Sequence, residues 1–310
     1  MIEARFPLRL GTRASPLAMA QAHQARAALL ARHGWDESAV EIVPMTASGD
    51  RIQDRALADV GGKALWTKEL DAALGTGGTD FSVHSMKDVE TIRPTGFVLA
   101  AMLPREDVRD RLIGVEKIAA LPQGAVVGTS SPRRTAQLLK ARPDLQIILF
   151  RGNVQTRLAK LAAGEAAATL LAAAGLERLG MHDTGHAIET AEMLPAPSQA
   201  AIGIECRADD EAVRDALSAI NHQLTCTCVE AERALLAELG ADCRSPVAAL
   251  ARVEKGGALL LRAQLLSLDG KHAVEGELLL GSHAEATPEH LARSLLERAP
   301  APVRKLFAGR

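Results

Sequence analysis

Gly11-Thr12-Arg13-Ala14-Ser15-Pro16 and Gly128-Thr129-Ser130-Ser131-Pro132-Arg133-Arg134 are two stretches of the same design. Each follows a short apolar run and contains a serine and then a proline, which are favoured at the N-cap and the first position of a helix. A helix that starts there exposes free backbone N–H groups and the positive end of its dipole, and both stretches carry arginine. They predict two related lobes, each with a strand-to-helix junction that binds an anion.

Apolar runs alternate with helical patterns around these junctions. The predicted strands are 8–10, 40–45, 81–84, 97–102, 125–128, 147–150 and 169–172. The predicted helices, rich in Ala, Leu, Gln, Lys and Glu, are 17–32, 64–74, 133–141 and 154–163. This alternation is typical of α/β lobes.

The pattern changes after about residue 223. A predicted helix, 229–239, precedes three strand-like runs, 247–253, 258–266 and 272–280, and a closing helix at 288–298. The gaps between the runs contain glycine, which is a hairpin signal. This region is therefore predicted to form a small antiparallel sheet.

Composition excludes several classes of protein. The chain has 310 residues, of which 47% are apolar and 24% charged, as in a soluble protein of two or three domains. Aromatic residues make up only 2%, and the formal charge is −2, so nucleic acid and anionic membranes are disfavoured as partners. The N-terminus lacks a signal-peptide pattern and no apolar run is long enough for a membrane span, so we expect a cytoplasmic protein.

Arginine dominates the basic residues, with 27 of the 36. A compositional habit is one explanation, and bidentate recognition of carboxylates or phosphates is the other. The segment 130–160 has seven basic residues and one acidic residue, which favours an anion-binding lobe. Arg151-Gly152-Asn153 follows an apolar run, and Arg157 lies near the start of the next helix, so both guanidinium groups are expected to converge on a ligand. For Lys140 and Lys160 a solvated helix face is the alternative.

His84-Ser85-Met86-Lys87-Asp88-Val89 ends another predicted strand. Lys87 is suited to neutralising an anion, and Asp88 to stabilising a cation or moving a proton. An ordinary surface role is the alternative for Asp88, and a hydrogen-bonded structural role is expected for His84.

Other motifs carry less. Gly61-Gly62-Lys63 lacks the spacing of a nucleotide phosphate loop, and no zinc-binding spacing occurs, so we expect no metal. Of the four cysteines, Cys206 is expected in the core, and Cys226 and Cys228 are expected to pack at a helix start. Cys243, in a turn-rich stretch beside Arg244, is predicted to be an exposed thiol that is partly ionised and nucleophilic.

Taken together, the motifs resemble the porphobilinogen deaminase family, also called the hydroxymethylbilane synthases. The resemblance runs nearly end to end through Thr12–Ala18, Gly49-Asp50, Val60–Lys63, Val83–Val89, Val127–Ser131, Arg133-Arg134, Arg151–Val154, Thr156–Leu158, Ala174–Leu176, Arg178–Gly180 and Gly203–Arg207.

The resemblance implies an α/β protein of three domains: two lobes like periplasmic binding proteins around a cleft, and a small α+β C-terminal domain with a three-stranded antiparallel sheet. The expected division is 1–103 with 198–221, 104–197, and 222–310. It also implies a dipyrromethane cofactor linked through a thioether to Cys243. The implied enzyme is a monomeric transferase. It joins four porphobilinogen molecules head to tail with loss of ammonia and releases a linear tetrapyrrole.

The resemblance also implies roles for single residues. Asp88 is the expected catalytic residue, which stabilises the azafulvenium-type cation formed on loss of ammonia. The residues expected to bind substrate or cofactor are Arg13, Ser15, Lys87, Thr129, Ser131, Arg133, Arg134, Arg151, Gly152, Asn153, Arg157, Arg178 and Gln199.

This chain departs from the family pattern at several positions. Ala241-Asp242 replaces Gly-Gly before Cys243, which is expected to place an extra negative charge beside the cofactor. Ser198 and Ala200 replace two glycines, Trp66 replaces Phe, and Glu90 replaces Pro. A non-catalytic two-lobed module that binds carboxylates, or a weakly active paralogue, is the alternative interpretation.

Overall fold

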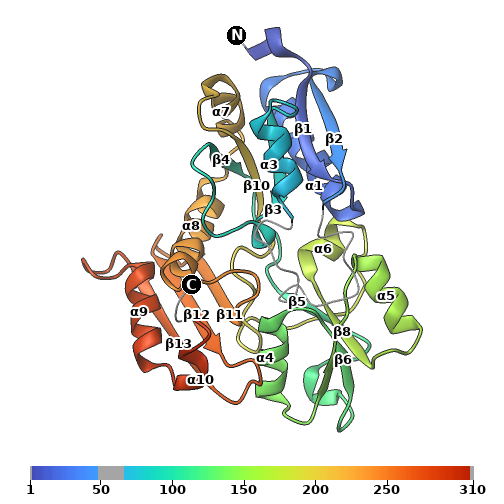
Figure 1. The fold of residues 1–310 in the computed structure, drawn as a ribbon, viewed down its shortest axis with the longest axis vertical. Coiled ribbons are helices and arrows are strands. Elements are labelled where there is room, and N and C mark those ends of the chain that lie inside the picture. The colour runs from blue at the N-terminus through green and yellow to red at the C-terminus, as the bar shows by residue number, and fades with distance from the viewer. Residues whose placement is uncertain (1, 48–65, 308–310) are drawn as a thin grey trace. The chain divides into compact units, whose positions relative to one another are not determined.

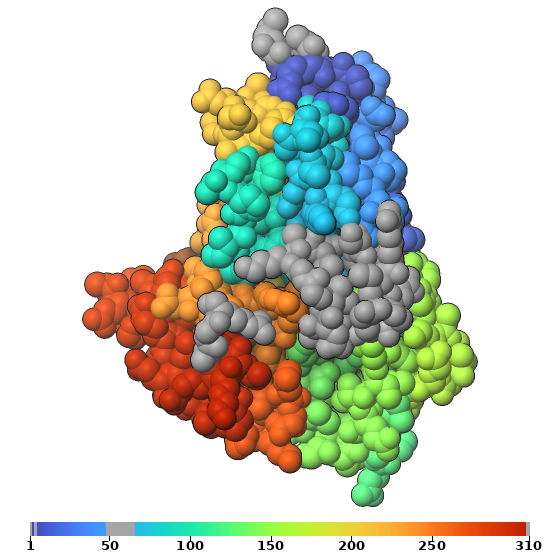
Figure 2. All heavy atoms as spheres, in the orientation of Figure 1, coloured from blue at the N-terminus to red at the C-terminus, as the bar shows by residue number. Residues whose placement is uncertain are grey.

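The computed structural model describes residues 2–47 and 66–307, which divide into two compact units (Figure 1). The described residues of the first unit are 2–47, 66–106 and 200–226. Although these segments are far apart in the sequence, they lie side by side, as the blue, teal and yellow surface in Figure 2 shows. The second unit comprises residues 107–199 and 227–307.

A five-stranded mixed sheet is the centre of the first unit. Its strands, in spatial order, are β2 (Val40–Met45), β1 (Leu8–Arg13), β3 (Phe81–Ser85), β10 (Ile202–Arg207) and β4 (Phe97–Met102). β1 is parallel to β2 and β3, whereas β10 is antiparallel to β3 and β4. The helices of this unit are α1 (Pro16–His33), α3 (Lys68–Gly75) and α7 (Glu211–Ser218), with short 3-10 turns at η1 (Ile2–Arg5), η2 (Glu37–Ala39) and η3 (Met86–Asp88).

Helix α1 shows how the local sequence sets an element. Ser15 is its N-cap and accepts a hydrogen bond from Ala18 N, and Pro16 occupies the first turn. Gly34 ends the helix with φ of 66° and donates its N–H to Leu30 O. The fully buried Ala22, Ala25 and Leu29 recur at helical spacing and pack in the core of this unit.

A second five-stranded sheet, in the second unit, repeats the pattern of the first. Its order is β7 (Gln146–Ile148), β6 (Val126–Gly128), β8 (Ala168–Ala172), β5 (Asp110–Ile113) and β9 (His186–Ala187). β6 is parallel to β7 and β8, and β5 is antiparallel to β8 and β9. The predicted relation between two α/β lobes is therefore confirmed by strand order and direction.

The C-terminal region adds an antiparallel sheet of β11 (Val247–Val253), β12 (Leu259–Leu266) and β13 (Ala273–Leu280), as predicted. The remaining helices of the second unit are α4 (Pro132–Ala141), α5 (Val154–Ala162), α6 (Ala173–Arg178), α9 (Pro288–Arg298), α10 (Ala301–Arg304) and most of α8 (Gln223–Glu238), with a 3-10 turn at η4 (Ile118–Ala120). No helix in the described part of the chain is both long and apolar enough to cross a lipid bilayer.

The sequence patterns missed or misplaced several elements. α8 begins at Gln223 rather than at residue 229. Thr225 N donates to His222 Nδ1 and Cys226 N donates to His222 O, and these hydrogen bonds form the first turn. The sequence did not predict this turn because its residues have low helix propensity. β5 was not predicted, since the charged Asp110 and Arg111 occupy half of this four-residue strand. β9, α6 and α10 were too short to give a periodic signal, and α7 was not predicted.

The chain passes between the two units at Ser198-Gln199-Ala200, where two residues have left-handed backbone conformations. Ser198 has φ of 62° and Ala200 has φ of 71°. Ser198 N donates to the buried Glu232 carboxylate at 2.5 Å, which anchors the strained segment. A side chain in this region costs about 1–2 kcal/mol that glycine does not.

We expect Ser198→Gly to raise the free energy of unfolding by about 1 kcal/mol, because relief of strain outweighs the extra entropy of glycine in the unfolded chain. The buried Ser198 hydroxyl has no hydrogen-bond partner among the described residues, so its loss has little cost. Ala200→Gly should gain less because a buried methyl group is lost. Urea denaturation measures both, with Ala201→Gly as a destabilising control; a destabilised Ser198→Gly would contradict the strain argument.

Candidate functional site

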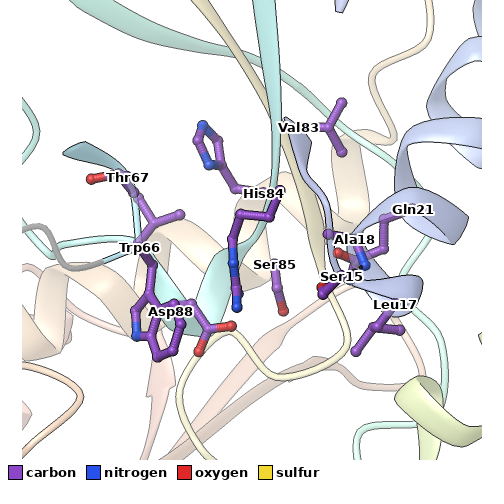
Figure 3. Close-up of a pocket in the computed structure, with 12 residues that line it drawn as sticks. Ser15, Leu17, Ala18, Gln21, Trp66, Thr67, Val83, His84, Ser85 and Asp88 are labelled. Atoms are coloured by element: carbon purple, nitrogen blue, oxygen red, sulfur yellow. Dashed lines mark hydrogen bonds between the residues drawn. The ribbon is translucent and has the colours of Figure 1, made fainter. Parts of the chain in front are cut away.

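A pocket in the first unit lies where β1 and β3 end and α1 begins (Figure 3). β1 and β3 are parallel neighbours, so their carboxyl ends meet at one edge of the sheet, the usual ligand-binding edge of α/β folds. Arg13, Ser15 and Asp88 line this pocket. The structure thus brings together three of the residues that the sequence indicated.

Asp88 is positioned by its neighbour Met86 at the start of η3. Met86 is 1% exposed and its N–H donates to Ala201 O at 3.0 Å. A Cβ atom on Gly203 would lie 2.1 Å from Met86 Sδ, so the strand beside this turn requires glycine. The buried methionine fixes the turn, and the half-buried Asp88 carboxylate faces the pocket.

Trp66 forms one wall of the same pocket. The Arg13 guanidinium carbon lies 4.1 Å from the centre of the Trp66 ring, which is a cation–π contact. This contact restricts the guanidinium plane of Arg13 and shields one of its faces from water. Carboxylate binding by Arg13 stays a prediction, and the Trp66 contact sets the orientation in which its guanidinium is held.

Sequence reasoning missed Gln21, which also lines the pocket. Its side chain is 3% exposed, and its Nε2 atom has no hydrogen-bond partner among the described residues. A buried amide without a partner is costly, so Nε2 is a donor available to a ligand. Its spacing from Leu17 and Ala18 on α1 was the signal, since residues three and four apart share one helix face.

A second group of predicted residues gathers in the second unit at the start of α4. β6 and β7 are parallel neighbours, so Thr129 and Arg151 follow adjacent strand ends. Ser131 is the N-cap of α4, as predicted, and accepts from Arg134 N. Arg157 donates to Gly152 O at 3.0 Å and its Nη2 lies 3.4 Å from Ser130 Oγ. These contacts place two predicted arginines at one junction.

The Arg151-Gly152-Asn153 loop is fixed by its own backbone. Gly152 has φ of 103°, and a Cβ atom there would lie 2.7 Å from Thr156 Cβ, so glycine is required. Asn153 is the N-cap of α5 and accepts from Thr156 N at 2.9 Å. The buried Arg151 is thereby held at the end of a rigid loop.

Arg133, Arg134 and Gln199 converge on one carboxylate of the chain itself, that of Asp110. Arg133 Nη2 and Arg134 Nη2 donate to Asp110 at 2.8 and 2.7 Å, and Gln199 Nε2 donates at 2.9 Å. Burial raises the Asp110 pKa, but the charges of Arg133 and Arg134 lower it by a larger amount. This pKa therefore lies well below its ordinary range. The local excess of positive charge is smaller than the sequence count implied, and a ligand-binding role for these three residues stays a prediction.

Cys243 lies on an exposed loop between α8 and β11, as predicted, whereas Cys206 and Cys228 are buried. Asp242 accepts from Arg244 N at 2.9 Å and from Arg244 Nη2 at 2.5 Å. Hydrogen bonding to Asp242 raises the Arg244 pKa. The extra charge expected from Asp242 is therefore offset by Arg244, and the guanidinium expected to activate the thiol is engaged by this carboxylate.

Lys87 lies in η3 beside Asp88, and Arg178 ends α6. Both are half-buried. The motifs Gly49-Asp50 and Val60–Lys63, with the phosphate-loop-like glycines, lie outside the described residues.

His84, which lines the pocket, and Glu205 are both buried in the first unit. His84 Nε2 lies 3.4 Å from Glu205 Oε2, which supports the structural role expected for this histidine. Burial raises the Glu205 pKa, but the nearby His84 ring and the hydrogen bonds from Arg93 lower it more, to about 2.

We expect acid to destabilise the protein through Glu205. Its pKa is about 2 in the folded chain and 4.5 ordinarily, so its stabilisation is complete above pH 4.5 and is lost as the pH falls toward 2. The effect amounts to about 3 kcal/mol. Glu205→Gln should be less stable than the wild-type protein at neutral pH, but its free energy of unfolding should fall less as the pH is lowered. Urea denaturation at several pH values measures this. Equal pH dependence in both proteins would contradict this assignment.

Comparison with known proteins establishes the family. A family model described as "Porphobilinogen deaminase, dipyromethane cofactor binding domain" matches residues 8–215. The chain belongs to the porphobilinogen deaminase family. A second model, "Porphobilinogen deaminase, C-terminal domain", matches residues 226–299.

Curated members of the porphobilinogen deaminase family are similar over almost the whole chain. The protein of this name from Sphingopyxis alaskensis is 62% identical over 307 residues, covering 97% of each chain. That from Paracoccus denitrificans is 49% identical over 306 residues, also covering 97% of each. A solved periplasmic substrate-binding protein of an ABC transporter from Coxiella burnetii is 16% identical, with a TM-score of 0.42, and the match covers 71% of this chain and 94% of that one.

Proposed function

We propose that this chain is a transferase that condenses four porphobilinogen molecules head to tail, with loss of ammonia, into the linear tetrapyrrole hydroxymethylbilane. The observation that carries the proposal is the pocket that Asp88 lines together with Arg13, Ser15 and Gln21. One carboxylate among donors for anions suits a substrate that carries carboxylates and becomes a cation during the reaction. The relatives named porphobilinogen deaminase disfavour a non-catalytic binding module.

Asp88 supplies the negative charge in this mechanism. When the C–N bond of porphobilinogen breaks, ammonia leaves with the electron pair, and the positive charge that remains spreads to the pyrrole nitrogen. A carboxylate that accepts a hydrogen bond from that N–H stabilises the cation. After the new C–C bond forms, the proton lost from the pyrrole carbon passes to Asp88 or through it to water.

The residues around Asp88 bind and orient the substrate. The Arg13 guanidinium, held flat by Trp66, binds an acetate or propionate group in bidentate fashion. Ser15, at the N-terminus of α1, and Lys87 add donors for a second carboxylate. Gln21 Nε2 completes the set as a buried donor.

The chain also has residues that fit a dipyrromethane, the cofactor named by the matching family model. Cys243 is an exposed thiol suited to a thioether bond. Arg151, Arg157, Thr129 and Ser131 supply a guanidinium-rich junction for cofactor carboxylates, and Arg178 is assigned to the same role. When bound, this group supplies the nucleophilic pyrrole carbon from which the product chain grows.

We also propose the domain division 1–103 with 198–221, 104–197, and 222–310. The two related five-stranded sheets and the antiparallel C-terminal sheet support it. A monomeric state and a cytoplasmic location stay predictions.

The intact mass of the purified protein tests the proposal. We expect a mass increase that matches a dipyrromethane, located on the Cys243 peptide by proteolytic mapping. A protein purified without it should gain this mass, and then further single-pyrrole increments, when porphobilinogen is added. A mass that stays unmodified after this addition would contradict the proposed function.

A further inference from the structure

One guanidinium behind the Asp88 pocket gathers three carboxylates from three parts of the first unit. Arg93 donates to Glu205 from Nε at 2.9 Å and from Nη2 at 2.7 Å. It also donates to Asp71 from Nη2 at 2.6 Å and to Glu90 from Nη1 at 2.5 Å. The Arg93 side chain is 9% exposed, and Glu205 is fully buried.

These contacts fix Arg93 in a single orientation. All three of its nitrogen atoms bond to carboxylates, and the three acceptors come from α3, the loop after η3 and β10. Buried charge pairs with several hydrogen bonds are rigid, because loss of any one leaves an unpaired charge. Arg93 therefore has a fixed position, and its hydrogen bond restricts the Glu90 carboxylate.

Glu90 extends this fixed cluster to the wall of the pocket. Both of its carboxylate oxygens lie 3.0 Å from Thr67 Oγ1, and Arg93 Nη1 lies 3.4 Å from the same hydroxyl. Thr67 is 1% exposed and lines the pocket together with its neighbour Trp66. Figure 3 shows the Thr67 hydroxyl pointing away from the pocket while the Trp66 ring lies on the side of Asp88.

We propose that Glu90 and Arg93 are positioning residues, which hold Thr67 and thereby keep the Trp66 ring over the Arg13 guanidinium. Neither residue is among the twelve described residues that line the pocket, so they act through Thr67 and Trp66. The wall is then formed before the substrate arrives, and Arg13 binds a carboxylate without first having to be ordered. This role rests on the proposed function only for its effect on substrate.

The fluorescence of Trp66 tests the proposal without any substrate. The chain has two tryptophans, and Trp35 packs against Phe6 and His33. Trp35→Phe therefore leaves Trp66 as the single reporter. In this background we expect Glu90→Ala to shift the Trp66 emission to longer wavelength and to raise its acrylamide quenching by about twofold, because the ring leaves its partly buried position.

Two further variants sharpen the test. Glu90→Gln keeps an oxygen that accepts from Thr67 but loses the charge that binds Arg93, so it should give an intermediate shift. Glu211→Ala, an exposed carboxylate at the start of α7, should leave the spectrum unchanged. Circular dichroism shows that the variants are folded; unchanged Trp66 emission and quenching in folded Glu90→Ala would overturn the proposal.

Kinetics provide the second readout. Glu90→Ala should raise KM for porphobilinogen by about fivefold to tenfold and change kcat less than about twofold, as expected when binding is lost and not transition-state stabilisation. An equal loss of kcat with unchanged KM would refute a positioning role. If the wild-type protein does not turn over porphobilinogen, the proposed function fails. The fluorescence result still decides whether Glu90 positions Trp66.

Discussion

Replacing Asp88 with asparagine is expected to leave a folded protein whose kcat is lower by about 10²–10³-fold, the usual cost of removing one preorganised electrostatic group. Asparagine keeps the size of the side chain and one acceptor oxygen, but it lacks the negative charge that we propose stabilises the pyrrole cation. It also cannot accept the proton that is lost after C–C bond formation. Steady-state turnover of porphobilinogen measures the effect.

The control is a carboxylate of the same unit that lies away from the pocket. Asp36→Asn changes a charge at the N-cap of η2 and should retain normal turnover. Thermal melts of both variants establish that they are folded. Near-normal turnover by Asp88→Asn would remove this carboxylate from the mechanism. If Asp88→Asn does not fold, Asp88→Ser takes its place in the same turnover assay.

Cys243→Ser is expected to abolish the covalent cofactor and, with it, at least about a thousandfold of the activity. A serine hydroxyl is a far weaker nucleophile than a thiolate at neutral pH, so no stable ether forms. Because the thiol is exposed on a loop, the substitution should leave the fold intact. Intact mass before and after addition of porphobilinogen measures attachment directly.

Cys226→Ser is the matched control, since this thiol lies in the first turns of α8 and is only partly exposed. Cys226→Ser should carry the same cofactor mass increment as the wild-type protein. A stable adduct on Cys243→Ser, located by peptide mapping on another cysteine, would show that Cys243 is not the attachment site.

Local sequence was sufficient to predict the elements that carry most of the site. Ser15-Pro16 and Ser131-Pro132 start helices as predicted, because the cap hydroxyl and the fixed proline φ act within one turn. The exposed loop of Cys243 and the three C-terminal strands followed from turn residues and apolar runs. In each case the interactions that decide the structure join residues close together in the chain.

Contacts between residues far apart in sequence were hidden from this reasoning. The excess of basic residues in the segment that contains Arg133 and Arg134 predicted an anion-binding lobe, yet Asp110, more than twenty residues earlier, binds both buried guanidinium groups. Gln21 gave a weak signal because nothing local shows that its amide is buried without a partner in the described chain.

The sequence by itself determined the two strand-to-helix junctions, the antiparallel C-terminal sheet, the family motif that contains Asp88 and the turn-rich stretch that contains Cys243. Only the tertiary structure decided which charges neutralise one another and which face a pocket. The Arg93 cluster shows this most clearly, since its carboxylates come from α3, a loop and β10. Helix caps and turns are set by neighbouring residues, whereas the pairing of buried charges depends on which strands and helices pack together, and no local pattern specifies that.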